Sequence, residues 1–364
     1  MGFKCGIVGL PNVGKSTIFN AITNAGAESA NYPFCTINPN VGMVSVPDKR
    51  LDTLVKAYNP RSIVPAVTQF VDIAGLVKGA SQGEGLGNQF LTHIRECEAI
   101  MEVVRCFDDE NIIHVHEVVN PLRDVEIIET ELILKDLESV EKRLAQETKN
   151  ARIGTAKAKE KLTACEALAK HLGTGKPARE IEKSEATEEL IFELALLTAK
   201  PIFYCANVSE SDVIKGNAYT EQLKKYAAER KQDMVIICGK IEEELAEMEP
   251  QEKAEFLKEL GMAESGLDQV VKKGYGILGL RTFFTAGEKE VRAWTFHKGW
   301  KAPACAGVIH TDFEKGFIRA ETLSYADFEK YGSLNAAKDA GHLRTEGKDY
   351  EVQDGDIMLF LFNS

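Results

Sequence analysis

The segment G-L-P-N-V-G-K-S, residues 9–16, carries residue types that bind nucleotide phosphates. It fits G-x-x-x-x-G-K-[ST] and lies between an apolar run over 3–9, which predicts a strand, and a predicted helix over 15–23. In such a loop the main-chain N–H groups of residues 12 to 17 surround the phosphates at a helix N-terminus. Lys15 would bridge the β- and γ-phosphates, and Ser16 would bind Mg²⁺. The predicted phosphate-binding residues are Asn12, Val13, Gly14, Lys15, Ser16 and Thr17.

A second segment, D-I-A-G-L at 72–76, has the residue types expected next to a γ-phosphate. Asp72 ends a predicted strand over 66–73 and would hold Mg²⁺, directly or through water. The main-chain N–H of Gly75 would reach the γ-phosphate, so Gly75 and Lys15 are the expected transition-state stabilisers. Thr36, in the turn-rich stretch 32–40, is a candidate second Mg²⁺ ligand that leaves when the γ-phosphate is lost.

Four glycines between 79 and 87 follow this segment. A loop so rich in glycine loses considerable conformational entropy when it becomes ordered. This suits a switch that folds around a bound nucleotide, and an ordinary flexible loop is the alternative.

The segment N-V-S-E at 207–210 follows a predicted strand over 201–206 and stands where proteins with this phosphate-binding motif recognise the base. The guanine-specific proteins of this fold carry N-K-x-D, in which the carboxylate accepts hydrogen bonds from guanine N1–H and the 2-amino group. Here the lysine is absent and the acid is one methylene longer, which removes the main reason to prefer guanine. Asn207 could pair with N7 and the exocyclic group of either purine. The predicted base-side residues are Asn207, Val208 and Glu210.

The elements that must position these residues alternate between strand-like and helix-like segments over the first 125 residues. This order predicts an α/β fold, in which a mostly parallel sheet has helices on both faces. Residues 1–124 and 200–279 are the expected nucleotide-binding domain. Residues 125–199 predict an inserted helical hairpin, with long helices to about residue 172 and a second arm over 185–199. Short strands at 282–285, 290–296, 305–309 and 356–362 predict a small α+β domain over 280–364.

Composition narrows the classes of protein. A chain of 364 residues predicts two or three domains. No apolar run is long enough to span a membrane, and the N-terminus has no signal-peptide pattern, so we expect a cytoplasmic protein. The net charge of −12 argues against a general nucleic-acid coating protein. Residues 138–179 nevertheless carry ten Lys and Arg against five Asp and Glu, which predicts either a solvated helix face or contact with RNA.

Together these motifs resemble those of the YchF-type, or Obg-like, ATPases, which belong to the Obg branch of the translation-factor P-loop proteins. The resemblance includes Y-P-F-C-T-I-N-P-N, D-I-A-G-L-V-K-G-A, and the C-terminal stretches F-F-T-A-G-E-K-E-V-R-A-W-T and I-H-T-D-F-E-K-G-F-I-R-A. It implies a G-domain with an inserted hairpin, a C-terminal ubiquitin-like TGS domain, a preference for ATP over GTP, and association with ribosomes. One stretch departs from the pattern, because Glu117 stands where relatives commonly have glycine.

The position after Gly75 raises the question of how water is activated. Many P-loop hydrolases have a glutamine there that orients the attacking water, whereas this chain has Leu76, as the resembling family does. His114 is one substitute, supported by the resemblance, although His116 is close by and an ordinary loop histidine is the alternative. A potassium ion beside Asn12, as in some relatives, is a second. A partner that orders the glycine-rich loop is the third, and all three predict slow turnover by the isolated protein.

The sequence thus predicts a Mg²⁺-dependent ATPase that acts as a switch on translation or the stress response. The expected partner is the ribosome, at its large subunit, with RNA contacts through the hairpin and the TGS domain. The alternatives are a GTPase with the same partners, a non-hydrolysing adaptor that binds nucleotide only for structure, and a small-molecule kinase. No segment indicates the acceptor pocket or the arginine-bearing lid that a kinase requires.

Overall fold

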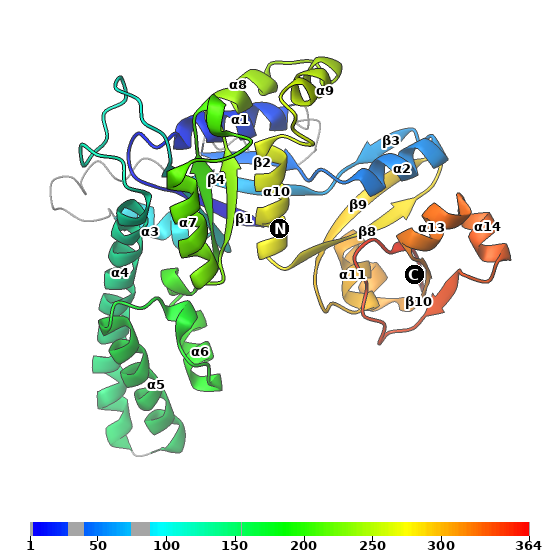
Figure 1. Ribbon diagram of the computed structural model, residues 1–364. Helices are drawn as coiled ribbons and strands as arrows, with labels where there is room; N and C mark the ends of the chain where they lie inside the picture. The colour runs from blue at the N-terminus through cyan, green and yellow to red at the C-terminus, as the bar shows by residue number, and fades with distance from the viewer. Residues whose placement is uncertain (1–2, 28–39, 74–87, 154, 364) are drawn as a thin grey trace. The chain divides into compact units, whose positions relative to one another are not determined.

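The computed structural model describes residues 3–27, 40–73, 88–153 and 155–363 (Figure 1). Thr36, Gly75, Leu76 and the glycine-rich stretch 79–87 lie outside this part of the chain. Two compact units are present, one within residues 1–43 and 69–274 and the other within 44–68 and 275–364. Residues 44–68, which the sequence analysis placed in the nucleotide-binding domain, therefore group with the C-terminal residues.

The first unit is built on a six-stranded sheet in the order β2-β4-β1-β5-β6-β7. The strands β4, β1, β5, β6 and β7 pair in parallel, and every residue of β5 and β6 is buried, as in a sheet covered on both faces. Parallel pairing brings the carboxyl ends of these strands to one edge, where the predicted site residues follow them. The strands are β1 Lys4–Val8, β2 Val41–Ser45, β4 Val67–Asp72, β5 Ala99–Arg105, β6 Ile202–Asn207 and β7 Asp233–Ile237. Strands β1, β4 and β6 confirm those predicted over 3–9, 66–73 and 201–206.

The helices of this unit include the one predicted to begin at Lys15. None of the helices in the described residues is long and apolar enough to cross a membrane. Around the sheet they are α1 Lys15–Ala27, α3 Asn88–Arg95, α7 Ala218–Glu229, α8 Gly239–Ala246, α9 Pro250–Glu259 and α10 Gly266–Ile277.

A helical hairpin is present, but its arms differ from the predicted ones. The long helix α4, Pro121–Asn150, is paired with α5, Ala156–Gly173, and the shorter α6, Glu185–Glu193, packs beside them (Figure 1). The helix predicted over 185–199 begins at Glu185 but ends at Glu193, and the arm paired with α4 is α5 instead. The buried Asp136 carboxylate accepts hydrogen bonds from the N–H groups of Leu197 and Thr198, both at 2.8 Å, and so fixes this stretch outside α6. The hairpin core contains Ile133, Val140, Ala164, Cys165, Leu168, Leu172, Ala178, Ala186, Leu190 and Leu196.

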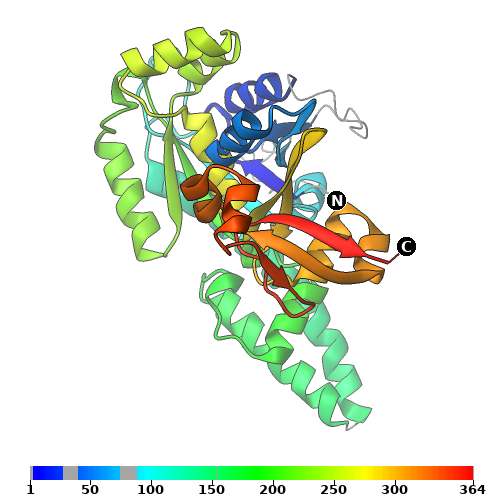
Figure 2. The ribbon, with the colours of Figure 1, turned by 90° about the vertical axis from the view of Figure 1, so that its right-hand side faces the viewer.

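The second unit contains a six-stranded sheet in the order β11-β10-β12-β8-β9-β3, shown in orange to red in Figure 2 apart from β3. Its first two elements come from residues 44–68, and Arg50 holds them by an ion pair with Asp354 at 2.9 Å. The strand predicted over 305–309 was wrong, because a helix that begins at Ala302, with Pro303 in its first turn, occupies these residues. The elements are α2 Lys49–Tyr58, β3 Ser62–Val64, β8 Leu280–Ala286, β9 Glu290–His297, α11 Ala302–Ile309, α12 Thr311–Lys315, β10 Phe317–Leu323, α13 Tyr325–Tyr331, α14 Leu334–Asp339, β11 Arg344–Glu346 and β12 Ile357–Phe362.

Candidate nucleotide-binding site

The loop after β1 has the backbone of a phosphate cradle. Gly9, Asn12 and Gly14 have positive φ angles of 151°, 62° and 96°, which turn successive peptide groups. A Cβ atom at Gly9 would lie 2.4 Å from the Val103 carbonyl oxygen, and one at Gly14 would lie 2.2 Å from the Asn207 side-chain nitrogen. Only glycine fits at these two positions, so the motif residues are required by the local packing as well as by the expected ligand.

Lys15, the first residue of α1, is buried and turned back over the loop. Its Nζ donates a hydrogen bond of 2.5 Å to the Leu10 carbonyl oxygen. Burial lowers the pKa of Lys15 to about 8, although the nearby Asp72 carboxylate acts in the opposite direction. The ammonium group is therefore poorly solvated here, and phosphate oxygens would be far better partners for it than one carbonyl oxygen.

Ser16 and Asp72 are the described candidates for binding Mg²⁺. Asp72 ends β4 and pairs with Ile7 of β1, two residues before the loop begins, while Ser16 is exposed at the start of α1. A hydroxyl and a carboxylate beside phosphate oxygens suit a hard cation that keeps part of its water shell. Within the described residues no group of three or more His, Cys, Asp or Glu could hold a metal ion. The donor set present thus fits a metal carried with nucleotide phosphates.

On the base side, Asn207 connects the phosphate loop to the following elements. Its Nδ2 donates to the Val13 carbonyl oxygen at 2.9 Å, and its Oδ1 accepts from the Gly239 N–H at 3.0 Å. One amide N–H and one oxygen lone pair remain for a base. Val208 is buried, with its own N–H bonded to the Ile237 carbonyl oxygen. Thr17 lies nearby, since its methyl group would lie 3.0 Å from a Cβ atom at Gly239.

Glu210 is exposed in a single-turn helix over 210–212 and forms an ion pair with Lys240. The carboxylate is thus paired with a cation in the position where a guanine-specific protein would use an acid to test the base. The structure places all three predicted base-side residues at the same edge of the sheet, with Asn207 buried and Glu210 on the surface.

His114 lies in the loop that follows β5, with its ring buried. Its Nε2 is 2.9 Å from Asp124 Oδ2, and its Nδ1 accepts a hydrogen bond of 3.2 Å from the His116 N–H. Because Nδ1 is an acceptor, the ring proton belongs on Nε2 and is donated to Asp124. Both nitrogens are occupied, so His114 reaches a water molecule only after one of these bonds breaks. The His116 side chain, by contrast, is exposed.

The same loop has an anchor that the sequence analysis missed. Arg105, the last residue of β5, is buried, and its guanidinium donates to the carbonyl oxygens of Phe107, Asp109 and Ile112 at 3.0, 3.2 and 2.9 Å. Asn12 of the phosphate loop donates to the Ile113 carbonyl oxygen at 3.1 Å. An arginine ending a strand that is apolar apart from Glu102 was the available signal, since a buried guanidinium needs several acceptors.

The backbone conformation of Glu117 shows how the loop accommodates this departure from the family pattern. Its φ angle is 62°, in the left-handed region that favours glycine, and its N–H donates to the His114 carbonyl oxygen at 3.1 Å. The loop has kept the turn that glycine adopts readily, and the glutamate side chain is exposed.

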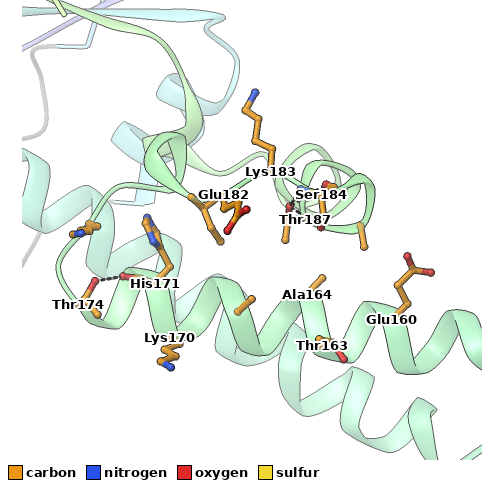
Figure 3. A pocket seen from close by; sticks show the side chains of 14 residues that line it. Glu160, Thr163, Ala164, Lys170, His171, Thr174, Glu182, Lys183, Ser184 and Thr187 are labelled. Atoms are coloured by element: carbon orange, nitrogen blue, oxygen red, sulfur yellow. Dashed lines mark hydrogen bonds between the residues drawn. The ribbon is translucent and has the colours of Figure 1, made fainter. Parts of the chain in front are cut away.

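A separate hollow lies between α5 and α6, with a volume of about 820 Å³ (Figure 3). Its lining includes Lys170, Lys183 and Glu182. Figure 3 shows Lys170 on the side of α5 away from α6, so the lysines do not converge on one point. This hollow lacks the arrangement of donors that the phosphate loop provides.

Comparisons with known proteins find a matching family for the N-terminal part of the chain and another for the C-terminal part. Residues 4–163 match the family described as "50S ribosome-binding GTPase", and residues 280–363 match the YchF-GTPase C-terminal family, described as a "protein of unknown function". The chain is 55% identical to the ribosome-binding ATPase YchF of Bacillus subtilis and 53% identical to that of Escherichia coli O157:H7, over 100% of each chain. The solved structure of the Schizosaccharomyces pombe YchF GTPase superposes with a TM-score of 0.91 at 44% identity, covering 99% of this chain and 98% of that one.

Proposed function

This chain belongs to the YchF family of P-loop proteins, and on that premise we propose that it is a ribosome-binding ATPase. The observation that carries the proposal is the loop over 9–16, whose buried Lys15 lies beside Asp72 at the carboxyl edge of the sheet. Lys15 and Asp72 supply a cation for the phosphate oxygens and a carboxylate for Mg²⁺, the two charges that phosphoryl transfer requires. Release of phosphate over many turnovers tests the proposal, and a single turnover or none refutes it.

Within this proposal each site residue has a role. The main chain of residues 12–17, including Val13, Gly14 and Thr17, binds the phosphates, and Lys15 stabilises the charge that develops on the transferred phosphoryl group. Mg²⁺, when bound, neutralises phosphate charge, and Ser16 and Asp72 would hold it. The roles proposed for Thr36 and Gly75 are carried over from the sequence motifs.

We propose that ATP is preferred over GTP. The support is Glu210, because its carboxylate is longer than the aspartate of guanine-specific proteins and is already paired with Lys240. Pairing with guanine would require breaking that ion pair, whereas adenine makes no such demand. Competition of unlabelled ATP and GTP for one labelled nucleotide decides between them, and stronger competition by GTP establishes the alternative of a GTPase switch.

Hydrolysis without a glutamine after Gly75 needs another way to place water, and three suppliers remain. His114 places the water once its ring leaves Asp124 or the His116 N–H. A potassium ion acts through Asn12, and a bound ribosome acts by ordering the site. His114→Ala should slow single-turnover ATP hydrolysis, while His116→Ala, a matched exposed neighbour, should not. Equal rates in sodium and potassium remove the cation.

The ribosome is the proposed partner, and its large subunit is the proposed site. The support is the 50S ribosome-binding family that matches residues 4–163 and the names of the bacterial relatives. The basic segment 138–179, now seen to lie mostly on α4 and α5, and the C-terminal unit are the proposed RNA contacts. Such a partner agrees with the expected cytoplasmic location. Co-sedimentation with purified 50S and 30S subunits tests this, and preference for 30S refutes it.

A further inference from the structure

The loop over residues 107–120 presents aliphatic side chains to water. Ile113 is 79% exposed, Val118 is 66% exposed and Ile112 is 37% exposed. Scattered apolar side chains are ordinary on a protein surface, but three within seven residues of one loop concentrate apolar surface, as at a contact with another molecule. None of these three side chains is used by the nucleotide site described above.

The main chain under this patch is held from inside. Arg105 fixes the carbonyl oxygens of Phe107, Asp109 and Ile112, and Asn12 fixes that of Ile113. A loop anchored in this way loses little further entropy when a partner binds. The exposed side chains are therefore presented in a fixed arrangement next to the phosphate loop.

The charge of the loop indicates the kind of partner. Four carboxylates, and no lysine or arginine, occur between residues 107 and 120. The next cation along the chain, Arg123, is engaged with Asp124 and the Val118 carbonyl oxygen. RNA phosphates would be repelled by this loop, whereas a protein segment with basic residues around an apolar centre would be attracted. The carboxylates belong to Asp108, Asp109, Glu110 and Glu117.

We propose that the aliphatic patch of Ile112, Ile113 and Val118, with its acidic surround, binds a basic segment of a ribosomal protein. The inference rests on the proposed function, because it names the partner within the ribosome. A partner seated on Ile113 bears directly on the hydrogen bond between its carbonyl oxygen and Asn12, so binding is transmitted to the phosphate loop.

Photo-crosslinking identifies the partner. The full chain with a photoreactive benzoylphenylalanine at position 113 is irradiated with purified ribosomes and a non-hydrolysable ATP analogue. We expect an adduct with a ribosomal protein, and a probe at Ile214, another aliphatic residue of the same unit that is 52% exposed, should not give this adduct. Adducts with ribosomal RNA or with a second copy of the chain, or no adduct from chain that sediments with ribosomes, overturn the proposal.

Affinity gives the second measurement. The double variant Ile113→Ser with Val118→Ser should bind ribosomes at least about tenfold more weakly, as expected for apolar residues at the centre of an interface. Its nucleotide affinity should match wild type, which shows that the variant is folded, and Ile214→Ser should leave both quantities unchanged. If the double variant binds ribosomes with wild-type affinity, the docking surface is refuted and the proposed function is not. Failure of the wild-type chain to sediment with ribosomes refutes the proposed function and this inference with it.

Discussion

Lys15 should make the nucleotide-free protein less stable than it would be without this lysine. The ammonium group is buried against one carbonyl oxygen, and burial lowers its pKa from 10.5 to about 8. A shift of this size corresponds to about 3 kcal/mol of unfolding free energy below pH 8. Replacing the charged end with an apolar one of similar length, as in Lys15→Met, removes this cost, so the variant should be more stable than wild type at pH 7.

The sign of the pH dependence follows from the same shift. Between pH 8 and 10.5 the unfolded chain binds more protons at Lys15 than the folded chain, so stability of wild type rises with pH relative to Lys15→Met. With a folded-state pKa of about 8, the gain between pH 7 and pH 9 is about 1 kcal/mol. The advantage of the variant should therefore shrink by this amount over that interval.

Urea unfolding of both nucleotide-free proteins at pH 7, 8 and 9 measures the effect. Far-UV circular dichroism is the appropriate signal, because the only two tryptophans, Trp294 and Trp300, both belong to the second unit. A pH-independent difference between the two proteins would contradict the reasoning, and so would a less stable Lys15→Met at pH 7. ATP provides a further test, because it should raise the unfolding free energy of wild type and leave that of Lys15→Met unchanged.

Three further predictions concern single contacts. Asn207→Ala leaves the Val13 carbonyl oxygen and the Gly239 N–H unpaired, which should lower the unfolding free energy by about 2–6 kcal/mol, whereas Asn111→Ala on the surface should cost little. Urea unfolding measures this, and similar losses for the two variants would contradict the role of Asn207. Glu117→Gly should raise the thermal midpoint slightly, since a left-handed residue costs about 1–2 kcal/mol and glycine entropy offsets part of it, while Glu117→Ala should not. Asp136→Ala should destabilise the hairpin by about 2–6 kcal/mol and expose residues 194–200 to limited proteolysis, and unchanged cleavage would refute the bond to Leu197 and Thr198.

Elements with a strong local pattern could be predicted from the sequence. The phosphate loop, the buried strands and the helix at Lys15 each follow from residue types within a short window, and the structure has them in place. The arms of the hairpin could not be assigned, because the pairing of α4 with α5 depends on which apolar faces meet. Residues 302–309 show the limit of propensity alone, since the same small apolar residues suit a strand or a helix, and Pro303 in the first turn favours the helix.

The positions of site residues were predictable where the sheet edge determines them, but their partners were not. Asn207 and Asp72 are the last residues of strands β6 and β4, so topology brings them to the phosphate loop. The bonds of Asn207 to Val13 and Gly239 join segments far apart in sequence, and nothing local indicates them. Arg105 was overlooked because its three acceptors are main-chain oxygens, which no sequence motif marks.

The hydrogen bonds of His114 allow the expected slow turnover to be given a magnitude. If this histidine places the water, its ring must first give up Asp124 or the His116 N–H, and in the first case the buried Asp124 carboxylate keeps Arg123 but loses the imidazole. A cost of about 2–4 kcal/mol for that opening leaves the competent loop populated about 30- to 900-fold less than the closed one. A partner that holds the loop open can recover at most this factor through His114. Ribosome stimulation of single-turnover hydrolysis far beyond it would show that the partner supplies a catalytic group of its own, and stimulation that persists in His114→Ala would lead to the same conclusion.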